Sequence, residues 1–156
     1  MKRRFLLAIM AALPVGAACA QTAAQPELPK EKLVIVTRDG QRHDFMVEMA
    51  LSPGQQTVGL MFRRSVPADG GMLFDWGAPR DSTMWMRNTV SSLDMVFINA
   101  DGAIRRVAEN TVPESLAIIE SRGPVRATLE LAAGTAKRLD IRVGDHVQQR
   151  IFGNAP

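Results

Sequence analysis

Turn dipeptides separate short strand-forming segments along most of the chain, and this spacing limits its fold more than any other feature. Asp-Gly pairs occupy residues 39–40, 69–70 and 101–102, and a Gly-Asp pair occupies residues 144–145. An Asp-Gly pair between two runs of strand-forming residues is typical of a β-hairpin. The sequence therefore predicts a mainly β fold, a small β-sandwich of jelly-roll type or a barrel, with one or two short helices.

Individual elements follow from local patterns. An alternating segment over residues 42–50 predicts a half-buried strand, and a short apolar run over residues 93–98 predicts a central one. The capping box that begins at Ser52 predicts a short helix, and residues 134–139 predict a second. The remaining predicted strands cover 33–37, 72–74, 104–108, 125–131, 141–143 and a last one from 146, with an irregular link over 76–81 and a long loop over 110–123.

The first residues have the pattern of a secretory signal. Basic residues 2–4 precede the apolar run 5–13, and Ala18-Cys19-Ala20 provides small residues for cleavage after Ala20. We therefore predict a signal peptide over 1–20, a flexible lead-in over 21–31, and one mainly β domain over 32–152. The protein would then be periplasmic or secreted. In the alternative, Cys19 is lipid-modified and anchors the chain, but the leucine expected three positions upstream is missing.

Cleavage at this position changes the charge balance. It removes three of the 19 Lys and Arg and none of the 16 Asp and Glu, which leaves 16 of each. A nucleic-acid partner therefore has no electrostatic support. The single cysteine is also removed, which excludes a thiol nucleophile and a disulfide from the mature chain. No later segment approaches the roughly 20 apolar residues of a membrane span.

A group of unusual side chains precedes and enters the predicted central strand. An indole stacks on sugars or apolar faces, a guanidinium pairs with a carboxylate, and an amide both donates and accepts hydrogen bonds. We therefore predict a ligand-binding site for a small molecule, glycan or peptide. Its predicted residues are Arg63, Trp85, Arg87, Asn88 and Asp94. The structural alternative is a core tryptophan with an arginine stacked on it and paired to Asp94.

Two other kinds of site are weaker alternatives. Asp94 with Glu109, or with Asp75, would form the carboxylate pair of a hydrolase if burial raised one pKa. In the competing structural role, Asp94 accepts hydrogen bonds from Arg87 or from backbone groups of the turn over residues 88–92. Met84 and Met86 are soft ligands on one face and would suit copper(I), although methionine is also ordinary core filler. No other cofactor is predicted.

Five ordered motifs resemble a known family. They lie at residues 59–63, 71–74, 85–89 and 93–98, and from 133–135 through 143–145. The chain resembles the domain of unknown function 192 family of bacteria and archaea over residues 34–147. The resemblance implies a single, mainly β domain with short helices, often exported, and it implies no established reaction. Our primary hypothesis from the sequence is thus an exported ligand-binding or accessory protein.

Overall fold

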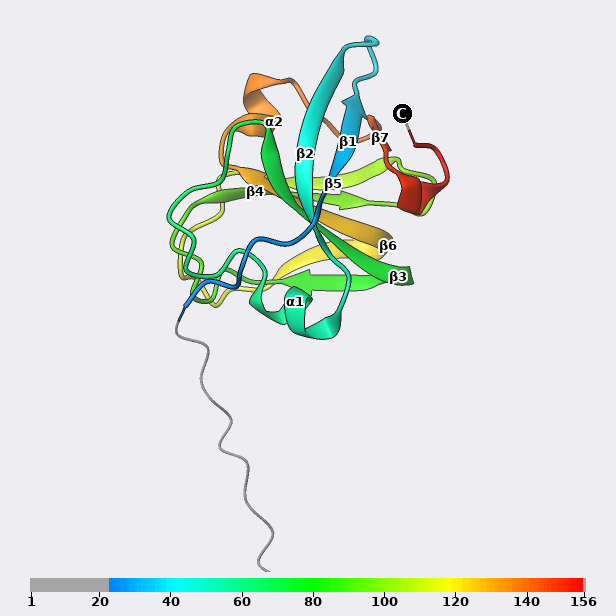
Figure 1. Cartoon of the computed structure of the whole chain (residues 1–156). Helices are drawn as coiled ribbons and strands as arrows, with labels where there is room; N and C mark the ends of the chain where they lie inside the picture. Colours follow the sequence, from blue (N-terminus) through cyan, green and yellow to red (C-terminus); the bar gives the residue numbers. More distant parts are fainter. Residues whose placement is uncertain (1–22, 156) are drawn as a thin grey trace, which may run out of the picture.

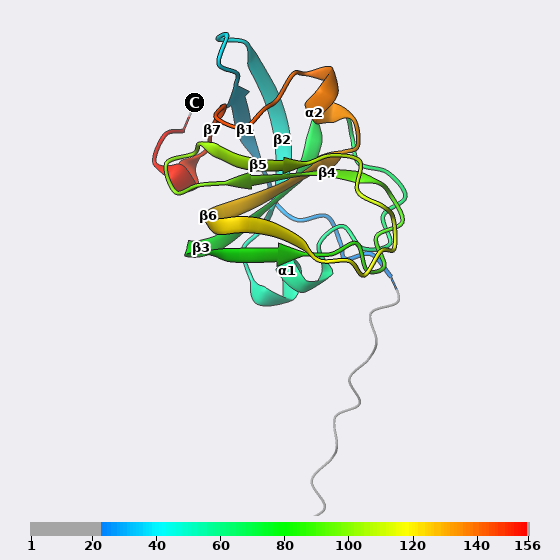
Figure 2. The same cartoon turned by 180° about the vertical axis from the view of Figure 1, so that it is seen from behind.

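The computed structural model describes residues 23–155 and confirms a mainly β domain (Figures 1 and 2). Seven strands form one strongly curled sheet in the order β5-β4-β6-β3-β2-β1-β7. Adjacent strands are antiparallel except β2 and β3, which are parallel. The strands are β1 Lys30–Val36, β2 Arg42–Ala50, β3 Gly70–Met84, β4 Leu93–Ile98, β5 Ile104–Ala108, β6 Ile119–Ala132 and β7 His146–Gln148. The helices are α1 Pro53–Val58, α2 Thr135–Arg138 and the 3-10 turn η1 Arg150–Phe152.

The curl of the sheet brings its two ends together. Ala103, just before β5, forms an isolated bridge with His146 of β7. The amide of Ile104 donates to the Asp145 carbonyl, and the amide of Val147 donates to the Gly102 carbonyl, both at 2.8 Å. These bonds make the sheet a half-barrel in which the two outermost strands meet at one end.

Strands β3 and β6 are much longer than the sequence predicts. They pair from Met72 opposite Glu130 to Met84 opposite Ile119, with register shifts between 75 and 80 and between 81 and 83. At these shifts the paired ribbon turns back on itself (Figure 1). The prediction of an irregular link at 76–81 and of a loop extending to 123 was therefore wrong. Glycine and proline there bend the ribbon without ending it, since β-bulges allow pairing to resume.

Smaller differences concern the ends of elements. Residues 141–143 do not form a strand, and β3 ends at Met84, so residues 85–89 form a turn region. Burial alternates from Met84 through Arg87, as it does along a strand. Strand β1 begins at Lys30, inside the predicted lead-in. The predicted signal peptide and Cys19 lie outside the described residues.

Two apolar clusters cover the two faces of the sheet. The first takes side chains from all seven strands and α2, and includes Leu73, Val96 and Leu129. The second cluster lies on the opposite face and includes Phe74 and Phe97. It is covered by the segment after α1 and by residues 80–84, the returning arm of β3 that follows the bend. Because side chains alternate along a strand, Leu129 of β6 faces the first cluster while its neighbour Glu130 faces the second.

Helix α1 is positioned against this second face. The predicted capping box is present, because the Ser52 hydroxyl accepts from the Gln55 amide and the Gln55 side chain accepts from the Ser52 amide. The helix ends at Gly59, with φ of 51°. A Cβ atom there would lie 3.0 Å from the Phe74 ring, so glycine permits both the turn and the close approach.

Candidate functional site

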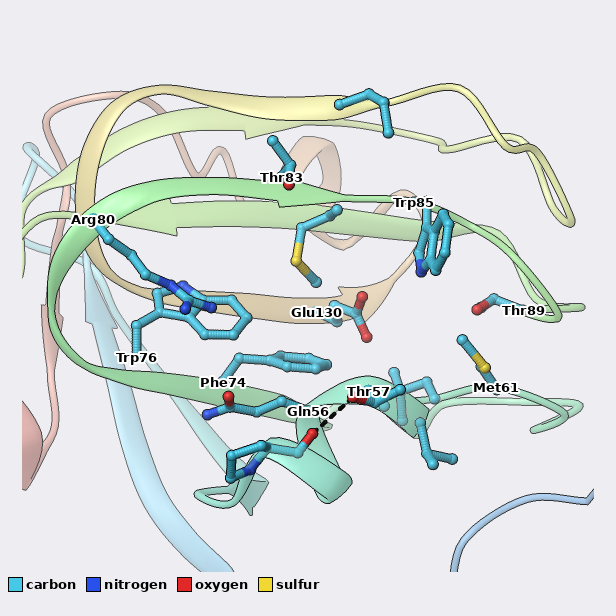
Figure 3. Close-up of a pocket in the computed structure, with 16 residues that line it drawn as sticks. Gln56, Thr57, Met61, Phe74, Trp76, Arg80, Thr83, Trp85, Thr89 and Glu130 are labelled. Atoms are coloured by element: carbon cyan, nitrogen blue, oxygen red, sulfur yellow. Dashed lines mark hydrogen bonds between the residues drawn. The ribbon is translucent and has the colours of Figure 1, made fainter. Parts of the chain in front are cut away.

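A cavity of about 500 Å³ lies between α1, the returning arm of β3 and the second face of the sheet (Figure 3). Apolar walls come from Leu60, Phe74, Met84 and Ile118, among others. This volume falls within the range of sites that enclose small organic molecules. The fold thus leaves unfilled space on one face of the sheet.

Glu130 is the carboxyl group in the lining of this cavity. It lies in β6 between Met72 of β3 and Met95 of β4, and only 5% of its surface is exposed. Within residues 23–155 its carboxyl group makes no hydrogen bond and no ion pair. Burial raises the pKa of Glu130 to about 8, because the apolar surroundings penalise the charged form. Figure 3 shows the carboxyl pointing into the space between Phe74 and Trp85.

Several neutral polar groups in the lining have donated their hydrogens to backbone carbonyls. The Gln56 amide nitrogen donates to Ala50 at 3.1 Å and to Asp75 at 2.7 Å. The Thr57 hydroxyl donates to the carbonyl of Pro53 at 2.8 Å, and the Thr89 hydroxyl donates to that of Arg87 at 3.3 Å. The oxygens of these side chains therefore remain as acceptors, whereas Arg80, Thr83 and the Trp85 indole in the same lining remain as donors.

Two tryptophans, which are all the tryptophans of the chain, line the cavity. The Trp76 ring packs on Phe74 with centroids 5.8 Å apart, and the Arg80 guanidinium lies 4.2 Å from its centroid. The Trp76 indole nitrogen donates to the Thr128 hydroxyl at 3.3 Å. Trp85 comes from the segment after β3 and is 42% exposed. A ligand entering the cavity would contact both indoles.

Of the predicted ligand residues, Trp85 is the one that lines this cavity. Arg87 is exposed and stacks on Trp85, 5.5 Å from its ring centroid. The Asn88 amide nitrogen lies 3.9 Å from the Met61 sulfur, and its carbonyl accepts from the Phe62 amide. Asn88 thus ties its own segment to the segment after α1.

The other two predicted ligand residues make internal contacts. Arg63 is 16% exposed on its side chain and forks onto the buried Glu48 carboxylate, at 2.6 and 2.8 Å. Asp94 is fully buried and accepts from the amides of Asn110 at 2.8 Å and Ala136 at 2.9 Å. Those amides, and not Arg87 or the turn over residues 88–92, are its partners.

The predicted carboxylate pair does not face a shared cavity. Asp94 and Glu109 flank the register pair Met95–Ala108 at neighbouring strand ends, as expected. Glu109 is exposed while Asp94 is buried, and neither lines the 500 Å³ cavity. Asp75 is paired with Arg126 at 2.8 Å. The geometry therefore gives the hydrolase alternative no support.

The two predicted methionine ligands differ in their surroundings. Met84 lines the cavity, whereas Met86 is fully buried and its sulfur lies 3.2 Å from the Thr111 hydroxyl. Among the described residues, no group of three or more His, Cys, Asp or Glu side chains is arranged to hold a metal ion. The copper hypothesis remains a prediction without further support.

Sequence reasoning missed Glu130, Trp76 and Arg80. Residues 125–131 alternate, and the apolar members were expected to form the buried face. Glu130 belongs to the opposite set, which the same pattern assigns to solvent. A signal was present in the flanking leucines, because a glutamate between Leu129 and Leu131 in a central strand can be covered on both sides.

Comparison with known proteins assigns the family. The model of the DUF192 family, described as "Uncharacterized ACR", matches residues 34–149. The chain belongs to this family. The match confirms the resemblance of the five motifs, and the DUF192 family has no assigned activity.

Two crystal structures share both the fold and appreciable sequence identity. A Sinorhizobium meliloti protein, proposed in its description to be a transcription regulator, is 48% identical with a TM-score of 0.79. The match covers 82% of this DUF192 chain and 99% of that one. A Novosphingobium aromaticivorans protein of unknown function is 35% identical with a TM-score of 0.76, covering 89% of this chain and 100% of that one. No curated protein matches the chain.

Helices that would cross a bilayer are not found in residues 23–155.

Proposed function

We propose that this DUF192 protein is an exported small-ligand-binding protein. The observation that carries the proposal is the 500 Å³ cavity with a buried, unpaired Glu130 carboxyl. Burying a polar group without a partner is unfavourable by several kcal/mol, so a fold that retains one beside an open space is suited to a ligand that supplies the partner.

The lining supports recognition of a molecule with an apolar part. Leu60, Phe74 and Met84 provide apolar contact deep in the cavity, and Trp85 provides an aromatic face at its exposed side. A few converging polar groups within apolar walls are typical of small-molecule sites. Because Glu130 is the single carboxyl that lines the cavity within residues 23–155, the arrangement favours binding over the two-carboxylate hydrolysis of glycosidic bonds.

Export is part of the proposal and rests on residues 1–20. Their basic start, apolar run and small residues before position 21 are typical of a cleaved signal peptide. Mass spectrometry of the protein recovered from cells that express the full chain would test this. We expect a mature N-terminus at Gln21, whereas a mass that includes a lipid on Cys19 would support the anchored alternative.

A role in transcription regulation, as proposed for the Sinorhizobium protein, finds no second support in this chain if it requires binding to DNA. Residues 21–156 contain equal numbers of basic and acidic side chains. DNA-binding domains attract phosphates with an excess of Lys and Arg. We therefore prefer the ligand-binding proposal.

A thermal-shift screen tests the binding function. The mature chain would be heated with small metabolites, sugars, short peptides and amphiphiles, because a ligand specific to the native state raises the melting temperature. At 100 times its Kd, such a ligand stabilises the fold by roughly 2.7 kcal/mol. Hits would be titrated by intrinsic fluorescence, since both tryptophans line the cavity.

A matched pair of variants localises the binding. Trp85→Ala removes an aromatic face of the cavity and should weaken binding about tenfold, the equivalent of roughly 1.4 kcal/mol. Val90 is on the same turn, is 43% exposed and does not line the cavity, so Val90→Ala should bind as wild type does. Equal binding by all three proteins would show that the hits bind elsewhere.

A further inference from the structure

We infer that the cavity selects an organic monoammonium ion, a primary amine on an apolar body, and that Glu130 is its counter-charge. This inference rests on the proposed binding function and adds the chemical class of the ligand. It is carried by the Glu130 carboxyl, which has no partner among the described residues and faces the cavity, together with the acceptors on α1 and at Thr89.

The polar side chains on α1 and at Thr89 present acceptors, whereas donors in the lining come from Arg80, Thr83 and the Trp85 indole. Gln56 has used both amide hydrogens on Ala50 and Asp75, which leaves its Oε1 as the free polar atom. The hydroxyls of Thr57 and Thr89 have also donated to backbone carbonyls. A ligand that places a donor group on this side of the cavity gains these acceptors, and an ammonium group brings three donors.

Glu130 supplies the charge that an ammonium group requires. The carboxyl is unpartnered and points into the cavity (Figure 3). Without a ligand, its raised pKa of about 8 keeps most of it protonated at neutral pH. When an ammonium ion binds, the carboxylic O–H bond breaks and the proton passes to the solvent. The resulting carboxylate pairs with the ammonium, which retains all three of its hydrogens.

The other lining residues indicate the apolar part of the ligand and the number of charges that the ligand carries. Phe74, Leu60 and Ile118 favour a hydrocarbon or aromatic body. Arg80 also lines the cavity, and no salt bridge pairs it with a carboxylate among the described residues. Its guanidinium, stacked on Trp76, would repel a second cationic group. A single ammonium group is thus favoured over a polyamine.

Three probes of one size test the charge selectivity: hexylamine, 1-hexanol and hexanoate. They would be titrated into the mature protein at pH 6 and pH 8 with tryptophan fluorescence as the readout. We expect hexylamine to bind at least tenfold more tightly than hexanol at pH 8. Its affinity should fall about tenfold per pH unit well below the pKa of Glu130, since binding then requires loss of a proton. A pH indicator in weakly buffered solution should record up to one proton released per amine bound.

Glu130→Gln removes the counter-charge at nearly constant volume. We expect the variant to lose at least tenfold in hexylamine affinity, to bind hexanol as wild type does, and to release no proton. Glu109→Gln removes an exposed carboxylate away from the cavity and should change none of these values. The melting temperatures of both variants would verify that they fold.

Other results of these titrations would contradict the ammonium inference. Binding of hexanol or hexanoate as tight as that of hexylamine, or full amine affinity in Glu130→Gln, would overturn the ammonium inference. Wild-type protein that does not bind hexylamine at pH 8 would overturn it too. Cavity-dependent hits of another class in the wider screen would leave the binding function standing, so the two failures are distinguishable.

Discussion

The surroundings of Asp94 and of Glu130 are two opposite solutions to burying a carboxyl group in one sheet. Asp94 is enclosed at the start of β4, where two backbone amides donate to its two oxygens. Glu130 lies near the end of β6, beside open space, with no partner among the described residues. The first group connects segments of the chain, and the second remains available to a molecule from outside.

The comparison also separates burial from function. Both residues are almost inaccessible to solvent, so burial alone does not distinguish them. What differs is whether the protein itself satisfies the oxygen atoms. A satisfied carboxylate stabilises the fold, whereas an unsatisfied one lowers stability and is consistent with a binding role.

The largest effect should come from Asp94→Ala. The substitution leaves the amides of Asn110 and Ala136 buried without an acceptor. Hydrogen bonds to a charged group contribute roughly 1.5–3 kcal/mol each, so we expect the free energy of unfolding to fall by about 4 kcal/mol. Urea denaturation at pH 7 measures it, and a loss below about 1 kcal/mol would contradict the structural role.

Removing the Glu130 carboxyl should raise stability at pH 7, whereas removing that of Asp94 should lower it. The pKa of Glu130 rises from 4.5 to about 8 on folding, so the native state binds more protons than the unfolded state between these values. Stability therefore falls as pH rises through this window, by about 3 kcal/mol between pH 4.5 and pH 7. Glu130→Gln should lack this contribution and be more stable than wild type at pH 7. Denaturation of both proteins across the pH range measures the difference. Free energies of unfolding that change with pH equally in both proteins would contradict the prediction.

An intermediate loss of stability is expected at Glu48, a buried carboxylate that pairs with the Arg63 side chain. Arg63→Met removes the fork on Glu48 and leaves that carboxylate with the Leu28 amide as its remaining donor. Breaking a largely buried ion pair is costly, but the partial exposure of Arg63 reduces the loss, so we expect about 2 kcal/mol. Chemical denaturation would detect it, and ligand affinity should be unchanged because Arg63 does not line the cavity.

The smallest effect belongs to Glu109, the exposed neighbour of Asp94. Glu109→Gln should change the free energy of unfolding by less than about 0.5 kcal/mol, as is usual for surface substitutions. The same denaturation assay provides the value. A loss comparable to that of Asp94→Ala would mean that the two carboxyls act together after all.

Much of the fold could be predicted because its turns carry local signals. The Asp-Gly pairs at 39–40 and 101–102 marked hairpins, and Ser52 with Gln55 marked the start of α1. The full lengths of β3 and β6 could not be predicted. Gly77 and Pro79 have the composition of a loop, and their place in a bent ribbon depends on pairing with residues about 45 positions away in sequence.

The site was less predictable for a related reason. Trp85 was identified because an indole beside arginine is unusual in a short strand pattern. Glu130 was not, since alternation tells which face a side chain shares but not what covers that face. The cover consists of α1 and the returning arm of β3, both of which are placed by tertiary contacts.

The C-terminal residues close the curled sheet because they bond to both of its ends. β7 pairs with β1, while His146 and the turn before it bond to the segment that opens β5. A polypeptide that stopped before residue 141 would uncover the β1 edge and the start of β5 at once. Exposed strand edges recruit other chains, so self-association is the expected fate of such a fragment. During synthesis, the curled sheet is therefore completed only when the C-terminal segment has emerged.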